Sequence, residues 1–292
     1  MWKLVTPDGE HQFGPVAVES LSVAGPSYRD EDVPAPRADG VWMGQDFADP
    51  GDLVLTVVVE AGGIPDPAER RRFVDDASQS FSQMWDAVRV RSSPMQLAEL
   101  WTEHGVVEGR PRMVEWDRAD YAAGFLRGRA RFVRSTAGHF LVSGGESWRE
   151  AEVQIVPPEP RDGWEWPLEW PLLTHNPTVR ASWFEVGGDT DTPVVLSVQG
   201  PLAAGAEVEV PGAFRARTVR ALAHDQVAVL DARPGRMLQT INGVPSPFLT
   251  PDSSLLSGFV LSPGPHSLAL RGVSSDGMAR ASLRWRDMKA GI

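Results

Sequence analysis

A run of prolines and tryptophans at residues 157–171 constrains this chain more than any other stretch. Five prolines fall within it, together with Trp164, Trp166 and Trp170. Proline fixes φ and removes a backbone donor, so neither a helix nor a central strand is expected to continue through the run. We interpret residues 158–171 as a stiff, extended connector whose tryptophans pack against flanking domains. This divides the chain into domains at residues 1–157 and 172–292.

The bulk composition excludes several classes of function. The length of 292 residues suffices for two domains, and 42% apolar content with 23% charge is typical of globular proteins. A net charge of −11 argues against nonspecific binding of nucleic acid and favours a surface that repels DNA moving past it. The absence of cysteine excludes thiolate chemistry and fits assembly in a cytoplasm. No apolar stretch is long enough to predict a signal peptide or membrane insertion.

The first domain is predicted to contain one helix packed on a curled antiparallel sheet. Asp66, Pro67 and Glu69 suit the first turn, where Asp caps and Glu completes a capping box. The helix is expected to end near Arg91. Apolar residues recur along it at steps of three and four: Phe73, Val74, Ala77, Phe81, Met84, Trp85 and Val88. We interpret this stripe as core packing rather than as a groove for a partner.

The strand predicted at residues 124–133 has two unlike faces. One carries the arginines and the other is apolar: Phe125, Arg127, Arg129 and Arg131 alternate with Leu126, Ala130 and Phe132. A row of arginines suits either a solvated face or a subunit interface. A second candidate contact is the polar loop from Arg29 to Asp46, which includes Arg37 and Asp39 and is expected to be partly extended.

The second half consists of short predicted strands separated by turns about every ten residues. Asn242-Gly243 is a strong signal for a tight hairpin, and Pro263-Gly264 is a second turn. This spacing predicts a β-sandwich or jelly roll, so the whole chain is predicted to be mainly β.

No catalytic, cofactor or metal site is predicted. The histidines are scattered, and no HExxH, phosphate-binding or nucleophile-elbow motif is present. Glu165 and Glu169 stand beside the connector tryptophans, as paired carboxylates do in glycoside hydrolases. We favour packing of the connector over catalysis there.

The order of elements in the second half resembles the C-terminal domain of the distal tail proteins of long-tailed phages, called Dit. The resemblance rests on these segments: Val227–Asp231, Arg236–Leu238, Ile241-Asn242-Gly243, Gly258–Gly264, Ser267–Leu270 and Ala281–Arg286. The helix near Pro67 and the loop before Leu53 also fit the family's first domain.

The resemblance implies a fold and a function. It implies a split β-barrel-like first domain with one helix and a galectin-like second domain. It implies a non-enzymatic structural protein that forms a homohexameric ring in the virion, at the tail tip. The implied partners are further copies of the chain, the tail tube protein and a tip or baseplate hub protein. A receptor-binding protein is an optional partner, and DNA is only passing cargo.

Two alternatives remain open. A carbohydrate-binding module or adhesin would use the sandwich and the tryptophans, in particular Trp164 or Trp170. A glycosidase would need Glu165 as a catalytic carboxylate. The sequence does not decide the host, the ring symmetry or the identity of the tube and hub partners.

Overall fold

The computed structural model describes residues 2–23, 27–29, 33–34, 41–42, 47–85, 97–155, 181–234 and 236–290. For residues 27–29, 33–34, 41–42 and 47–49 it describes only the backbone. The chain forms two compact units. Unit 1 comprises residues 1–145 and 289–292, and unit 2 comprises residues 146–288.

Unit 1 is built on a nine-stranded sheet. Its main path runs in the order β2-β1-β9-β10-β11-β8-β3, and β12 pairs with β10 and with β25. The strands are β1 (Lys3–Thr6), β2 (Gly9–Gln12), β3 (Ala17–Val23), β8 (Asp52–Glu60), β9 (Ala98–Trp101), β10 (Val106–Asp117), β11 (Phe125–Arg134), β12 (Gly138–Phe140) and β25 (Met288–Ala290). The short 3-10 helix η1 (Tyr121–Ala123) precedes β11. Neighbouring strands along this path are antiparallel, as the sequence predicts.

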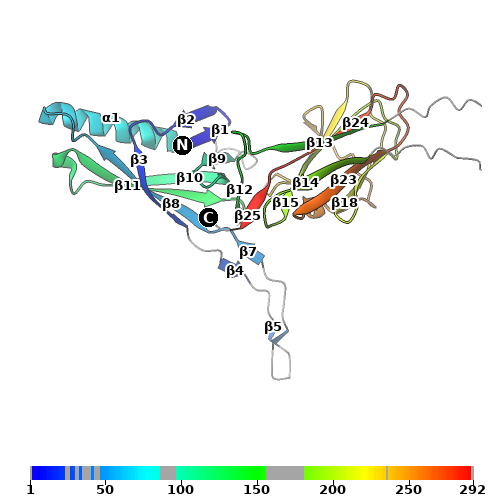
Figure 1. Cartoon of the computed structure of the whole chain (residues 1–292), viewed down its shortest axis with the longest axis horizontal. Helices are drawn as coiled ribbons and strands as arrows, with labels where there is room; N and C mark the ends of the chain where they lie inside the picture. Colours follow the sequence, from blue (N-terminus) through cyan, green and yellow to red (C-terminus); the bar gives the residue numbers. More distant parts are fainter. Residues whose placement is uncertain are drawn as a thin grey trace, which may run out of the picture. The chain divides into compact units, whose positions relative to one another are not determined.

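Helix α1 (Pro67–Trp85) lies along one face of this sheet (Figure 1). Its start is capped as predicted, since the Asp66 carboxylate accepts hydrogen bonds from the backbone N–H groups of Ala68 at 3.1 Å and Glu69 at 3.4 Å. The described residues of the predicted apolar stripe belong to the core of unit 1. Val74, Ala77, Phe81 and Trp85 are buried in it, and the partly buried Phe73 and Met84 pack against it. Val88 and Arg91 lie outside the described residues.

The loop predicted between β3 and β8 contains four short strands. They are β4 (Ser27–Arg29), β5 (Val33–Pro34), β6 (Val41–Trp42) and β7 (Phe47–Asp49). β4 pairs with β7 and β5 pairs with β6, both antiparallel. The two pairs are nested in sequence, because β5 and β6 both lie between β4 and β7. Arg37 and Asp39 lie outside the described residues.

Unit 2 is a sandwich of two main antiparallel sheets. One runs β13-β24-β16-β19-β20-β21 and the other β14-β23-β17-β18, with β15 paired to β22. The strands are β13 (Arg149–Gln154), β14 (Ala181–Val186), β15 (Thr192–Pro193), β16 (Val195–Gln199), β17 (Glu207–Val210), β18 (Phe214–Arg217), β19 (Val227–Asp231), β20 (Leu238–Ile241), β21 (Val244–Pro245), β22 (Val260–Leu261), β23 (Gly264–Arg271) and β24 (Arg280–Trp285). The 3-10 helix η2 (Leu256–Gly258) precedes β22.

Alternating strand residues from both sheets form one apolar core in unit 2. Leu196 and Leu283 come from one sheet, Val208 and Leu268 from the other, and all are at most 1% exposed. The predicted hairpin at Asn242-Gly243 is present between β20 and β21. Both turn residues have positive φ, 50° and 78°, as a two-residue turn of this kind requires.

The boundary between the units is not where the sequence suggested. Residues 146–157 were expected in the first domain, but β13 pairs with β24 and its Ala151 and Val153 are buried in the sandwich core. Residues 289–292, expected in the second domain, belong to unit 1. The division therefore falls after Gly145 rather than at residue 157.

The connector prediction also needs correction. Residues 158–171 lie between β13 and β14, and both strands belong to unit 2. The run therefore does not link the two units along the chain. Trp164, Trp166 and Trp170, with Glu165 and Glu169, lie outside the described residues, and their predicted packing stays a prediction.

The mainly β fold class is confirmed, with a sandwich in unit 2 and one α-helix among the described residues of unit 1. None of the described helices combines the length and apolar character needed to cross a membrane.

Candidate subunit interface

The predicted two-faced strand is β11. Arg127, Arg129 and Arg131 are exposed, while Leu126, Ala130 and Phe132 are at most 1% exposed. Alternation along a strand places these sets on opposite faces of the sheet. Phe125 is only partly exposed, and the Arg127 guanidinium lies 5.8 Å from its ring centroid. The structure thus places the four predicted residues on one strand face.

Neighbouring strands extend this surface. Val54, Thr56 and Val58 of β8 stand opposite Arg131, Arg129 and Arg127 in the register, and all three are half-buried. We call the six residues Val54, Thr56, Val58, Arg127, Arg129 and Arg131 the arginine face. It is the side of the sheet opposite α1, and it combines aliphatic groups with guanidinium groups.

Two of its arginines are held by acids at the sheet margin. Arg127 donates to Glu19 at 2.8 Å, and Arg131 donates through Nε to Asp52 at 2.6 Å. All four side chains are solvent-accessible, so each pair stabilises the fold by only about 0.2–1 kcal/mol. Their effect is to fix the direction of the guanidinium groups.

Arg129 lies at the centre of the row. In the register it stands opposite Thr56 on one side and Glu115 of β10 on the other. Within the described part of the chain, the Arg129 side chain forms no hydrogen bond and no ion pair. None of the described residues therefore occupies its five donors, which suit a carboxylate on another molecule.

The helix side of the sheet holds the arginine face in position. Trp85 of α1 is fully buried and donates its indole N–H to the backbone carbonyl of Arg131 at 3.1 Å. Gly128 leaves space for the Trp116 ring, because a Cβ there would lie 2.6 Å from a ring carbon. Trp116 in turn donates to the Ser82 hydroxyl on α1 at 2.8 Å. These contacts tie β10 and β11 to the helix.

The sequence did not reveal Glu19 and Asp52 as partners of the arginines. Their pairing depends on the register of β3 and β8 against β11, and β3 contains an irregularity between Val18 and Ser20. A local sequence pattern carries no information about such a register shift.

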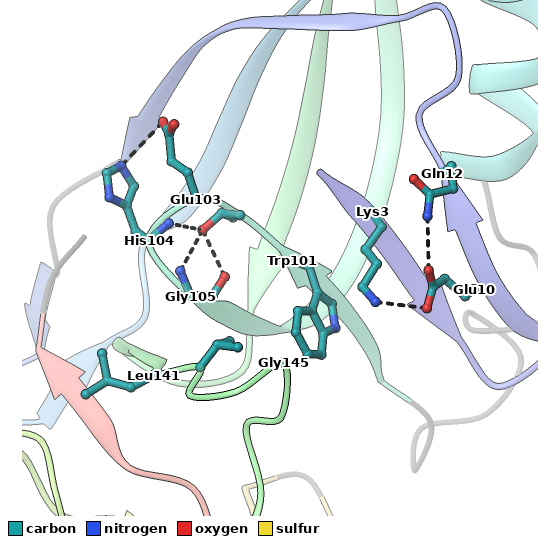
Figure 2. Close-up of a pocket in the computed structure, with 11 residues that line it drawn as sticks. Lys3, Glu10, Gln12, Trp101, Glu103, His104, Gly105, Leu141 and Gly145 are labelled. Atoms are coloured by element: carbon teal, nitrogen blue, oxygen red, sulfur yellow. Dashed lines mark hydrogen bonds and ion pairs between the residues drawn. The ribbon is translucent and has the colours of Figure 1, made fainter. Parts of the chain in front are cut away.

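A second candidate is the hollow of about 450 Å³ shown in Figure 2. Lys3 lies over the Trp101 ring, 4.3 Å from its centroid, and forms an ion pair with Glu10 at 2.9 Å. The hydrogen bond from Lys3 lowers the pKa of Glu10, so this carboxylate is a poor proton donor at neutral pH. His104 and Glu103 lie 3.7 Å apart and both are largely exposed. We interpret these groups as surface ion pairs.

Metal binding has no support in the described regions. There, no three His, Asp or Glu side chains gather into a group suited to a metal ion.

A helix-covered sheet in unit 1 followed by a β-sandwich in unit 2 is a fold shared with a solved distal tail protein of a phage. The solved SPP1 Dit protein, described as a paradigm of the hub adsorption apparatus in phages that infect Gram-positive hosts, matches 98% of both chains with a TM-score of 0.57 and 11% identity. The phage P2 baseplate in its activated conformation with calcium matches 97% of both chains, with a TM-score of 0.43 and 11% identity. Its strontium form gives 0.41 and 12%.

No family model and no curated protein matches the sequence. At 11% identity, the likeness to SPP1 Dit establishes the fold. The resemblance seen in the sequence is confirmed at that level.

Proposed function

We propose that this chain is a structural subunit of a phage tail, located at the distal end where the tube meets the tip or baseplate. The observation that carries the proposal is the fold shared with SPP1 Dit over 98% of both chains. The match spans both units, so it includes their order along the chain as well as each fold. Fold alone does not fix function, and the proposal therefore needs a test of assembly.

In this proposal, copies of unit 1 form a closed ring, a homohexamer as in the resemblance. A cyclic ring uses heterologous contacts, in which one surface of a subunit meets a different surface of its neighbour. The arginine face suits one side of that contact, since guanidinium groups are favoured at interfaces and half-buried valines supply apolar area. The other side is then an acidic surface of the next copy.

The negative net charge of the chain suits a protein that lines a channel for DNA. A net charge of −11 gives a ring of copies a strongly negative field, which keeps a phosphate backbone from adhering to the wall. We expect the channel wall to be net negative. A wall lined mainly by Lys and Arg would contradict this part of the proposal.

The remaining partners follow from the same position in the virion. They are the tail tube protein on one side, the tip or baseplate hub on the other and, as an optional partner, a receptor-binding protein. Such a role is non-enzymatic and uses no cofactor or membrane insertion. Assembly in the host cytoplasm fits a chain without cysteine.

The experiment that tests the ring is a charge reversal at its proposed interface. Arg129→Glu places a carboxylate at the centre of the arginine face, where it repels an acidic surface on the neighbour. Native mass spectrometry and electron microscopy of the full-length chain are expected to show rings for wild type and loss of rings for this variant. Arg72→Glu is the matched control, because Arg72 is an exposed arginine on α1, at the opposite face of the sheet.

Equal ring formation by the Arg129→Glu and wild-type chains would contradict the assignment of this face. Deleting residues 30–46 tests the second predicted contact. We expect it to impair assembly while leaving unit 1 folded, since the deletion lies between β4 and β7 and outside the nine-stranded sheet. Unchanged assembly would argue against a role for this segment.

A further inference from the structure

Trp183 of β14 is conspicuously exposed in unit 2. Its side chain is 78% exposed, although an indole normally buries most of its surface. In the register it stands opposite Ser267 of β23, on the outer side of the sheet β14-β23-β17-β18. The inner side carries the buried core residues Val208, Val210, Phe214 and Leu268. Trp183 therefore contributes nothing to the core, and its exposure calls for an explanation.

Charged side chains cover the same outer side on β23, β17 and β18. Arg271 pairs with Glu209 at 2.8 Å and with Glu207 at 3.3 Å. Arg215 lies 3.7 Å from the other oxygen of Glu207. Glu207 and Glu209 are roughly one-quarter exposed, so the strands hold them close to the sheet surface.

A loop after β21 completes this row of charges. Asp252 lies 3.3 Å from Arg215 and 3.5 Å from Arg217. The hydrogen bond from Thr250, with Arg217 nearby, lowers the pKa of Asp252 and keeps it a carboxylate. The six side chains Glu207, Glu209, Arg215, Arg217, Asp252 and Arg271 form what we call the charged ladder. Its three arginines and three acids balance.

The same loop closes the free edge of β18. The hydroxyl of Ser254 accepts a hydrogen bond from the backbone N–H of Arg215, and that of Ser253 accepts one from the N–H of Arg217, each at 3.0 Å. The backbone N–H of Thr250 bonds the carbonyl of Arg217 at 2.8 Å. Because these edge groups are satisfied, an added peptide strand has no free ladder to join at β18. A ligand of this surface has to bind its face.

The strand register places Trp183 and the charged ladder on the same outer side of the sheet β14-β23-β17-β18. Ala181 lies two residues before Trp183 on the same side of β14. It stands opposite Ala269 of β23, and Ala269 stands opposite Glu209 of β17. The small Ala269, 4% exposed, separates β14 from the ladder. An apolar indole ring and a set of fixed donors and acceptors thus lie on the two sides of Ala269, on one face of the sheet.

The chemical groups on this surface indicate which class of ligand it suits. Protein interfaces have apolar cores depleted of charge, and desolvating paired ions under a protein is costly, so a single indole beside six charges is a poor protein site. The charges of the ladder balance, and the exposed Glu185 lies on the same side of β14 as Trp183, so this surface does not attract anions. Carboxylates and guanidiniums retain spare acceptors and donors after pairing, which suits a ligand with many hydroxyl groups.

We infer that the outer face of β14-β23-β17-β18 binds a neutral carbohydrate, whose ring stacks on Trp183 and whose hydroxyls hydrogen-bond the charged ladder. This inference is independent of ring assembly and adds a ligand to unit 2. It differs from sugar binding by the tryptophans of the 158–171 run, which are not involved.

The test starts with a glycan array of neutral and anionic oligosaccharides probed with the full-length chain. The best neutral glycan is then titrated by calorimetry into wild type, Trp183→Ala, Trp183→Phe and Val244→Ala. We expect Trp183→Ala to weaken binding by about tenfold or more, because it removes the stacking surface. Trp183→Phe retains an aromatic ring and is expected to keep most of the affinity.

Val244→Ala is the control, since Val244 is 64% exposed on the other sheet and its truncation should leave binding unchanged. Trp183→Ala should not unfold unit 2, because the side chain is outside the core. The inference is overturned if no neutral glycan binds, if only anionic glycans bind, or if Trp183→Ala binds as tightly as wild type. Glycan binding by the isolated chain does not read out ring formation, so the two proposals fail separately.

Discussion

Replacing Trp85 with alanine should remove a large part of the stability of unit 1. Trp85 is fully buried on α1, and its ring packs against Phe81 at 5.6 Å, Phe13 at 6.0 Å and Phe132 at 6.0 Å between centroids. A large-to-small change at such a site costs about 3–5 kcal/mol. Losing the indole hydrogen bond to the Arg131 carbonyl adds about 1 kcal/mol.

The expected sum is about 4–6 kcal/mol, against about 5–15 kcal/mol for a whole domain. Urea unfolding followed by far-UV circular dichroism measures this loss. Hydrogen exchange assigns it to unit 1, which is needed because a two-unit chain is not expected to unfold in one step. Trp85→Phe keeps an aromatic ring without the donor and should lie between wild type and Trp85→Ala.

Trp183→Ala is the matched control, because it makes the same substitution at a side chain that is 78% exposed. It should change the free energy of unfolding by less than about 0.5 kcal/mol. A loss below about 2 kcal/mol for Trp85→Ala, or equal losses for the two variants, would refute the claim that Trp85 holds α1 against β11.

Three further predictions concern local features. Asn242→Ala should lower the free energy of unfolding of unit 2 by about 1–3 kcal/mol in urea melts, because Ala is strained at φ 50° and the hydrogen bond from the Val227 N–H at 2.8 Å is lost; an unchanged melt would count against the turn. Lys3→Met should raise the pKa of Glu10 towards its ordinary value, as followed by NMR titration of the carboxyl carbon. The sign follows from the lowered pKa in the folded chain, since the Lys3–Glu10 contact is present at neutral pH and is lost as pH falls through that pKa; an unmoved titration would show that Lys3 is not the cause. Deleting residues 289–292 should speed amide exchange in β12 and destabilise unit 1 by about 1–2 kcal/mol, because β12 loses the strand β25; exchange at the wild-type rate would contradict this.

Local patterns in the sequence predicted much of the fold. The alternation at Arg127, Arg129 and Arg131 identified an exposed strand face, because side chains in a strand change sides at every residue. The Asp66 cap identified the start of α1, and Asn242-Gly243 identified a hairpin. Each of these signals depends on residues close together in the chain.

The rest depended on contacts between distant residues. β13 belongs to unit 2 because Ala151 pairs with Leu283, and no local pattern of residues 149–154 indicates that partner. The same limit applies to Glu19 and Asp52, whose arginine partners are set by strand register. Trp183 shares one face of β14 with the exposed Glu185, but the ladder beside it comes from β23, β17, β18 and the loop at Asp252, which are distant in sequence.

We propose that this chain is located at the distal end of a phage tail. The most direct test is electron microscopy of the phage particles produced by the genome that encodes it, decorated with an antibody against unit 2. We predict label in a ring at the junction of the tail tube with the tip or baseplate. Label confined to the capsid or spread along the tail, or purified particles that lack the chain, would contradict the account.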